Sequence, residues 1–183
     1  MIEWRIKLSS IFYILSCMEK KVLNIALVAH DSRKLELIDW CKHNLQWLSN
    51  HNLYATGTTG KMIEDVETQW VPNAENTQYQ YKEGPLLNKV TKLLSGPLGG
   101  DQQIGAMIAE GKIDVLIFFC DNLITQGHHQ DVGALVRLAS LYNIAFATNR
   151  TTADMLVTST LIDNAEYDRI IPTVINNYKN RLL

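Results

Sequence analysis

Short apolar runs alternate along the chain with segments in which apolar residues recur every three or four positions. A short continuous apolar run is typical of a strand buried on both faces, and the recurrence is typical of a helix with one buried face. The predicted strands are 23–29, 53–55, 115–119 and 144–148, with a last short one at 170–172. Regular structure is also expected to resume at 92–95, after a long irregular segment. This alternation predicts a parallel sheet with helices on both faces, the α/β class.

Helical periodicity and helix-end signals mark the segments between the strands. The predicted helices are 35–48, 102–110 and 131–142, followed by one that starts near 151 and one after 172. Gly111 suits the left-handed backbone that often ends a helix. Thr151 precedes Asp154 by three residues, a spacing that predicts a capping box.

Two segments fall outside this alternation. Residues 66–91 are polar, hold two of the 4 prolines and show no clean period. We predict an inserted surface loop there, which could include a hairpin around Tyr79 and Tyr81. Residues 1–17 are predicted to be a non-essential extension, so that a single domain begins at Met18. A weak signal or lipoprotein peptide is the alternative for the extension, although its apolar core is short.

Composition and charge narrow the class of partner. A chain of 183 residues, 46% of them hydrophobic, has the size of one domain with additions. The net charge of -2 disfavours binding to a phosphate backbone, so no nucleic acid is expected. The 3 cysteines form no CxxC motif, which argues against disulfides and zinc and indicates a reducing compartment such as the cytoplasm. No apolar run approaches the roughly 18 residues of a membrane helix, so no membrane partner is expected.

Polar residues follow several predicted strands, at the edge where parallel sheets bind ligands. They are His30 with Asp31, residues 56–60, residues 95–101, and Asp121 with His128. The glycines and threonines of 56–60 stand at a strand-to-helix turn, where backbone amides and a helix N-terminus favour an anion. With 95–97 as a second wall and Lys34 as a cation, this arrangement predicts a phosphate cradle. An ordinary Gly/Thr turn with a solvated lysine is the alternative.

Three aspartates, Asp31, Asp101 and Asp121, could converge at the same edge. Crowded carboxylates raise one another's pKa, which suits proton transfer. Asp101, at a predicted helix start, is the candidate base, with an ordinary N-cap aspartate as the alternative. His128 could polarise a carbonyl, but His128 and His129 lack the spacing of metal ligands, so no metal is predicted.

Several stretches closely resemble the methylglyoxal synthase family, from about residue 22 to residue 182. They are ALVAHD (26–31), LYATGTTG (53–60), LLSGPLGGDQQIGA (93–106), GKIDVLIFF (111–119) and ATN (147–149). The resemblance implies a three-layer α/β/α fold with a central, mainly parallel five-stranded sheet. It implies a carbon–oxygen lyase that converts dihydroxyacetone phosphate to methylglyoxal and inorganic phosphate. It further implies a cytoplasmic homohexamer that is inhibited by phosphate, bypasses part of glycolysis and needs no metal or organic cofactor.

The resemblance also assigns roles to individual residues. The implied catalytic residues are Asp101, as the base, together with Asp31, Asp121 and His128, which match site positions of the family. On chemical grounds His128 is the candidate hydrogen-bond donor to the enediolate, and Asp31 or Asp121 is the candidate proton carrier. The implied substrate- and phosphate-binding residues are His30, Lys34, Thr56, Gly57, Thr58, Thr59, Ser95, Gly96 and, reaching a neighbouring subunit, Arg181. Asp131 matches one further aspartate of the family site.

Three departures from the family pattern bear on the site. Residues 120–122 read Cys-Asp-Asn in place of Trp-Asp-Pro, which would loosen that wall. Residues 127–130 replace a Pro-His-Asp-Pro-like stretch, so the histidine role falls on His128 or on His129. The insert after Met62 is absent from the typical member. Regulatory domains of carbamoyl-phosphate synthases share this fold, so a non-catalytic phosphate- or nucleotide-binding domain is the alternative function.

Overall fold

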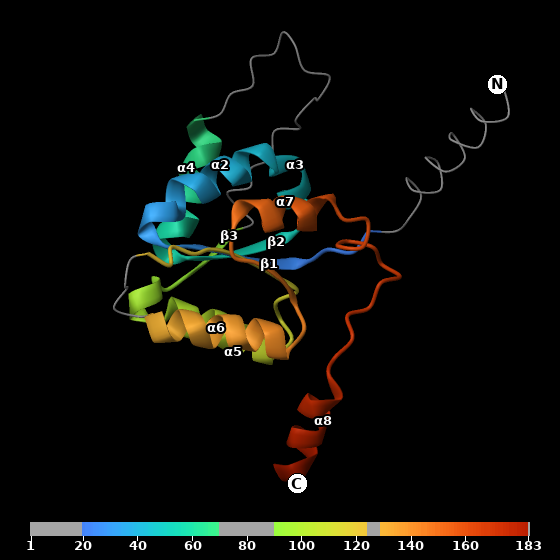
Figure 1. Ribbon diagram of the computed structural model, residues 1–183. Coiled ribbons are helices and arrows are strands. Elements are labelled where there is room, and N and C mark those ends of the chain that lie inside the picture. Colours follow the sequence, from blue (N-terminus) through green and yellow to red (C-terminus); the bar gives the residue numbers. More distant parts are fainter. Residues whose placement is uncertain (1–19, 70–89, 124–128, 183) are drawn as a thin grey trace, which may run out of the picture.

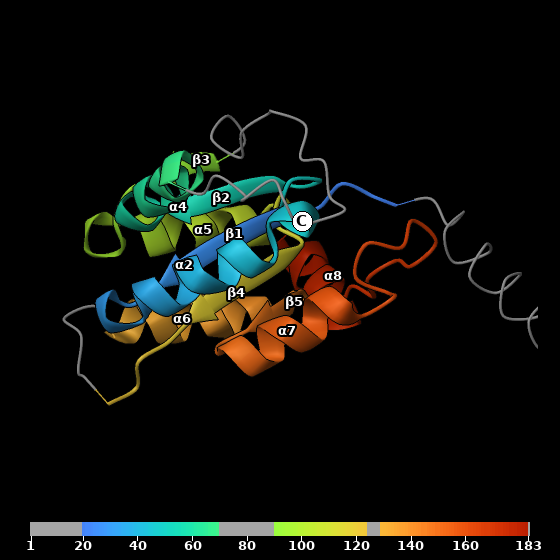
Figure 2. The same cartoon turned by 90° about the horizontal axis from the view of Figure 1, so that it is seen from above.

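Five parallel strands form the centre of the protein. The computed structural model describes residues 20–69, 90–123 and 129–182. The strands are β1 (Asn24–Ala29), β2 (Asn52–Thr56), β3 (Val90–Leu93), β4 (Val115–Phe119) and β5 (Ala145–Ala147). They pair in parallel in the order β3-β2-β1-β4-β5, which Figure 2 shows from above. The predicted α/β class with its parallel sheet is therefore confirmed.

Helices cover both faces of this sheet (Figure 1). The α-helices are α2 (Lys34–His43), α3 (Leu45–Leu48), α4 (Gly57–Gln69), α5 (Gly100–Ala109), α6 (His129–Leu141), α7 (Arg150–Thr158) and α8 (Thr173–Lys179). Short 3-10 turns are η1 (Asp31–Arg33), η3 (Gly96–Leu98) and η4 (Asn180–Leu182). Helices α2, α3, α4 and α7 pack on one face, and α5 and α6 pack on the other, which makes three layers. Within the described residues, no helix is long and apolar enough to cross a bilayer.

Side chains along β1 alternate between two separate cores, because successive residues of a strand point to opposite faces. Ile25 and Leu27 pack in the core that holds Trp40 of α2. Ala26 and Val28 belong to the second core, beneath α5 and α6. Both faces of the central strands are thus buried, which explains why these strands read as continuous apolar runs rather than alternating ones.

The predicted loop at 66–91 is wrong at both of its ends. Helix α4 continues to Gln69, and β3 already begins at Val90. Strand β3 is an edge strand whose Thr91 and Lys92 are exposed, so it carries no apolar run that the sequence pattern could reveal. Residues 70–89, with the suggested hairpin around Tyr79 and Tyr81, lie outside the described residues, as does the extension at 1–17.

Two predicted helix features also differ from the structure. The side chain of Asn149, not Thr151, caps α7, since its Oδ1 accepts a hydrogen bond from the Thr152 N–H at 2.9 Å. Asp154 instead accepts a hydrogen bond from the Trp40 indole N–H at 2.9 Å, a tertiary contact that competes with the capping role. The single helix predicted at 35–48 is interrupted at Asn44, between α2 and α3.

The strand predicted at 170–172 is absent from the structure, although the helix after it is present as α8. Ile170 and Ile171 are 77% and 41% exposed. The Ile170 carbonyl accepts a hydrogen bond from the Asn143 side chain at 2.9 Å, rather than from a neighbouring strand. Beyond this point α8 extends away from the layered body (Figure 1).

Candidate functional site

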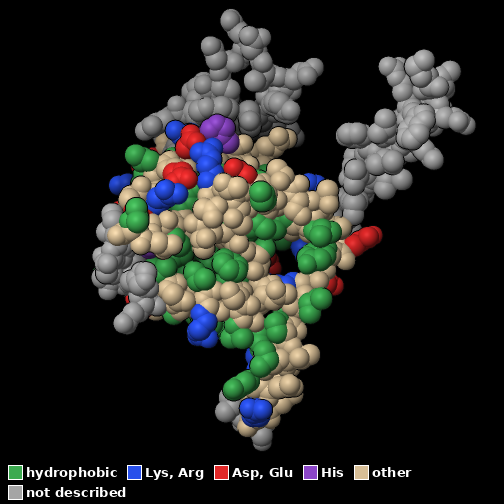
Figure 3. Space-filling model, in the orientation of Figure 1, with side chains coloured by type: hydrophobic (Ala, Val, Ile, Leu, Met, Phe, Trp, Pro, Cys, Tyr) green, Lys and Arg blue, Asp and Glu red, His purple; other side chains and the backbone are tan. Residues whose placement is uncertain are grey.

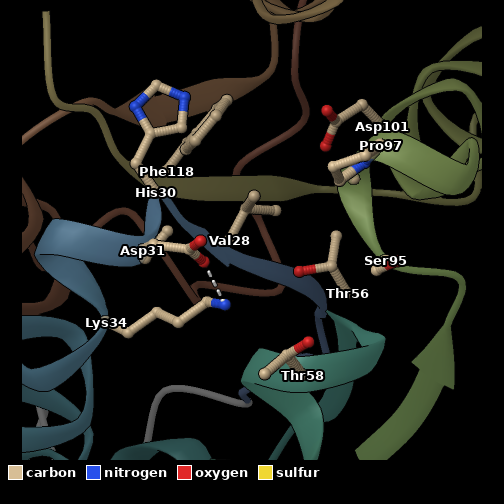
Figure 4. Close-up of a pocket in the computed structure, with 12 residues that line it drawn as sticks. Val28, His30, Asp31, Lys34, Thr56, Thr58, Ser95, Pro97, Asp101 and Phe118 are labelled. Atoms are coloured by element: carbon tan, nitrogen blue, oxygen red, sulfur yellow. Dashed lines mark hydrogen bonds and ion pairs between the residues drawn. The ribbon is translucent and has the colours of Figure 1, made fainter. Parts of the chain in front are cut away.

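A cavity of about 270 Å³ opens at the carboxyl ends of the strands, the edge predicted to bind a ligand. Figure 4 shows its walls, which come from the segments that follow β1, β2 and β3 and from the end of β4. The polar residues that line it are His30, Asp31, Lys34, Thr56, Thr58, Ser95 and Asp101. All seven are residues that the sequence singled out, so folding brings the predicted cradle and the predicted base to one cavity.

The threonine turn forms one wall of this cavity. Thr56 ends β2, and α4 begins at the next residue, Gly57, so strand and helix join without a loop. The buried Thr56 and Thr59 hydroxyls lie 3.3 Å apart and hydrogen-bond to each other, which fixes the turn. The exposed Thr58 lines the cavity at the N-terminus of α4, where a helix favours an anion.

The glycine-rich segment after β3 forms the facing wall. Ser95 accepts a backbone hydrogen bond from the Gly100 N–H at 3.0 Å, which folds the chain back between β3 and α5. A Cβ on Gly100 would overlap the Leu94 carbonyl oxygen and lie 2.9 Å from its carbonyl carbon. Only glycine therefore allows α5 to begin so close to the sheet.

Asp101 stands in the first turn of α5 with a side chain that is almost entirely buried, the residue being 2% exposed. The N-cap of α5 is Gly99, with a φ of 102°, so the interpretation of Asp101 as an ordinary N-cap is wrong. The helix N-terminus favours the negative charge of a carboxylate at this position. Burial raises the pKa of the nearby Cys120 thiol to about 11, and the Asp101 charge adds to the shift, so the thiol is neutral beside it.

Lys34 supplies the cation of the cavity. Its side chain is only 16% exposed, and its Nζ forms an ion pair of 2.5 Å with Asp31 (Figure 4). Asp31 itself is 86% exposed, so its carboxylate reaches the lysine from the solvent side. An ammonium group held in this way can exchange its carboxylate partner for a phosphate oxygen.

His30 connects the end of β1 to the end of β4. Its ring is buried, lines the cavity and packs edge-on against Phe118, with 5.1 Å between the ring centroids. Its Nδ1 accepts a hydrogen bond of 2.8 Å from the backbone N–H of Asp121. Asp121 is half-buried and is not among the residues that line the cavity.

Comparison with known proteins identifies the family. The sequence matches the family described as "MGS-like domain" over residues 36–148. Methylglyoxal synthase from Maridesulfovibrio salexigens is 52% identical over 151 residues, which cover 81% of this chain and 90% of that protein. The chain belongs to the methylglyoxal synthase family. Methylglyoxal synthase from Proteus mirabilis is 51% identical over 138 residues, covering 75% of this chain and 78% of that protein.

A solved structure supports the same membership. The crystal structure of methylglyoxal synthase from Elizabethkingia anophelis NUHP1 has a TM-score of 0.69 and 39% sequence identity, and the match covers 86% of this chain and 91% of that chain. The predicted fold and the predicted family are thus confirmed. Because these relatives bear the name of an enzyme, they favour an enzyme over the regulatory-domain alternative.

Not all of the predicted site residues are among the described residues that line the cavity. His128 lies outside the described residues, and His129 begins α6. Asp131 lies in the first turn of α6 and does not line the cavity. Arg181 is in η4, beyond α8, with its guanidinium 4.9 Å from the Tyr178 ring centroid. Among the described residues, no three His, Cys, Asp or Glu side chains cluster as metal ligands would.

The sequence reasoning missed several residues that shape the site. Val28 and Phe118 line the cavity, but in the sequence they cannot be told from ordinary strand residues. Ser32 hydrogen-bonds to the carboxylate of Asp121 and was not singled out at all. Its position directly after the His-Asp pair was the one available signal.

Proposed function

We propose that the protein is a carbon–oxygen lyase that converts dihydroxyacetone phosphate to methylglyoxal and inorganic phosphate. The observation that supports this function is a cavity with a buried carboxylate, Asp101, in a wall shared with a phosphate cradle. The cradle consists of Thr56, Thr58, Ser95 and Lys34. A base and an anion site in one cavity match a substrate that carries both an acidic C–H bond and a phosphate.

The first step is proton abstraction. Asp101 takes a proton from the hydroxymethyl carbon, and the electron pair of the broken C–H bond forms the carbon–carbon double bond of an enediolate. The carbonyl oxygen becomes the negatively charged oxygen and requires hydrogen-bond donors at that position. His128, or His129 in the alternative alignment, is proposed as one donor.

The second step is phosphate elimination. The hydroxyl on the carbon that Asp101 deprotonated loses its proton and becomes the aldehyde, the carbon–carbon double bond shifts toward the phosphate-bearing carbon, and the C–O bond breaks with its electron pair leaving on phosphate. The resulting enolate takes up a proton on that same carbon to give methylglyoxal. Thr56, Thr58 and Ser95 donate hydrogen bonds to the departing phosphate, and Lys34 neutralises its charge. Asp31 or Asp121 is proposed as the proton carrier, and the proposed mechanism uses no metal or organic cofactor.

We also propose a homohexamer that phosphate inhibits. The C-terminal segment supports the assembly, since Ile170, Val174 and Tyr178 are 77%, 44% and 62% exposed. Figure 3 shows hydrophobic side chains along this segment where it leaves the body. Apolar residues exposed on a projecting element are suited to packing against another subunit. Arg181 would then reach the phosphate site of a neighbour, where phosphate could bind as product or inhibitor.

The remaining proposals concern location and domain limits. Within the described residues Cys41 and Cys120 are free thiols, which supports a reducing compartment such as the cytoplasm. We further propose that the enzyme acts there in a bypass of glycolysis. We propose that residues 1–17 are dispensable and that 18–183 form one domain. Along the sequence, the insert falls between the two phosphate-binding segments that follow β2 and β3. A chain that starts at Met18 should keep its activity.

The decisive experiment measures phosphate and methylglyoxal released from dihydroxyacetone phosphate by the purified protein. Asp101→Asn keeps the size of the side chain but removes the base, so kcat should fall on the order of 10²–10⁴ with little change in KM. Asp168→Asn, which changes an exposed aspartate remote from the cavity, is the matched control. Normal turnover by Asp101→Asn would refute the role of Asp101, and no release by the unaltered protein would refute the function.

A further inference from the structure

Ser32, Asp121 and His30, which lines the cavity, form a closed ring of hydrogen bonds. The Ser32 hydroxyl donates to Asp121 Oδ2 at 2.5 Å, and the Leu123 N–H donates to Asp121 Oδ1 at 2.9 Å. The Asp121 backbone N–H donates to His30 Nδ1 at 2.8 Å. Ser32 lies in η1, whose N-cap is His30, so the chain itself closes the ring.

The direction of one bond decides the state of the imidazole. A backbone N–H can only donate, so His30 Nδ1 must hold a lone pair rather than a proton. A neutral imidazole that accepts at Nδ1 carries its proton at Nε2. Protonation of Nδ1 would break this bond and leave two donors facing each other. Burial against Phe118 further disfavours a charged ring, because a buried charge is costly.

We propose that Ser32 and Asp121 are positioning residues that hold His30 as the neutral, Nε2-protonated tautomer. The Asp121 carboxylate accepts two hydrogen bonds, one on each oxygen, and these fix the backbone whose N–H donates to the imidazole. The imidazole of His30 and the backbone N–H of Asp121 are about 90 residues apart in the sequence. They meet because His30 follows β1 and Asp121 follows the neighbouring strand β4. In this role Asp121 acts through its backbone N–H and its anchored side chain.

This role deepens the proposed function and rests on it. His30 lines the cavity that also holds Asp101, so a neutral Nε2–H can donate a hydrogen bond to the oxygen that becomes negative. A neutral donor does not protonate the enediolate outright, which would divert the intermediate from phosphate loss. A wrong tautomer would present a lone pair to the same oxygen and oppose its charge.

The first test is the tautomer itself, read by ¹⁵N NMR of the imidazole rings in the ligand-free protein. His30 signals are assigned by their loss in His30→Asn, which separates them from those of the other histidines, 5 in all. The expected spectrum has an unprotonated Nδ1 and a protonated Nε2. In Ser32→Ala the ¹⁵N chemical shifts of Nδ1 and Nε2 should move toward each other, because the Nδ1-protonated tautomer becomes populated. A protonated Nδ1 in the unaltered protein overturns the proposal.

The second test is kinetic and uses matched serine variants. Ser32→Ala should lower kcat about tenfold, the effect of losing one hydrogen bond to a charged group, with KM unchanged because the cradle is intact. Ser32→Thr keeps the hydroxyl and should restore both kcat and the spectrum. Ser49→Ala removes an exposed hydroxyl that donates to the Gln46 carbonyl, and should resemble the unaltered protein.

The outcomes separate the positioning role from the proposed function. If Ser32→Ala leaves either the spectrum or kcat unchanged, the positioning role is overturned. The ¹⁵N spectrum requires no substrate. It therefore reports the tautomer of His30 even if the protein does not turn over dihydroxyacetone phosphate. Such inactivity of the unaltered protein would overturn the proposed function instead.

Discussion

Gly100 makes the approach of α5 to the sheet possible, and its replacement by alanine should disturb both stability and catalysis. The new Cβ would overlap the Leu94 carbonyl oxygen and lie 2.9 Å from the Leu94 carbonyl carbon and 3.1 Å from that of Ser95. These are backbone atoms, so no side-chain rotation can relieve the overlap. Forcing a group into a packed site costs about 1–3 kcal/mol. For a chain of this size, that corresponds to a fall in Tm of roughly 2–12 °C.

The same displacement should reach the base, because Asp101 is the next residue. A shift of about 1 Å in a catalytic group can reduce the rate on the order of 10²-fold, so kcat should fall by about that factor. Thermal unfolding and phosphate release, measured on the same preparation, test both effects. Gly133→Ala is the matched control: its Cβ meets nothing within 4 Å in α6, and it should stabilise the protein by roughly 0.5–1 kcal/mol. If Gly100→Ala keeps the Tm and kcat of the unaltered protein, the steric argument fails.

Three further variants or modifications test the cradle, a helix cap and a thiol. Lys34→Ala should raise KM for dihydroxyacetone phosphate with some loss of kcat, and a pure kcat effect would contradict its place in the cradle. Asn149→Ala should cost about 1 kcal/mol in the free energy of unfolding, whereas Thr151→Ala should cost less, as measured by denaturant titration. The pKa of Cys120 is raised to about 11, so its alkylation rate should climb with pH up to that value, and a plateau below pH 9 would contradict the burial argument.

Local signals in the sequence were sufficient where neighbouring residues decide the structure. The apolar run Val115–Phe119 becomes the fully buried strand β4 with the predicted bounds. Gly111 has a φ of 73°, the left-handed conformation expected after α5. The clusters at 56–60 and 95–101 follow strands of a parallel sheet, so their meeting at one edge follows from topology.

Tertiary contacts decided the features that the sequence pattern missed or misassigned. Strand β3 exists because it pairs with β2, although its exposed Thr91 and Lys92 carry no apolar signal. Asp154 of α7 accepts a hydrogen bond from the Trp40 indole of α2, and the N-cap of α7 is Asn149.

The hydrogen bond between Asp121 and His30 shows most clearly which features the sequence determines and which only the tertiary structure decides. The sequence by itself determined the family, the parallel sheet and the set of polar residues at its carboxyl edge, because these depend on local pattern and on short motifs. Only the folded chain shows that the Asp121 N–H reaches the imidazole of His30, 91 positions away in the sequence. A hydrogen bond of this kind depends on how β1 and β4 lie side by side, and no local preference of either segment encodes it.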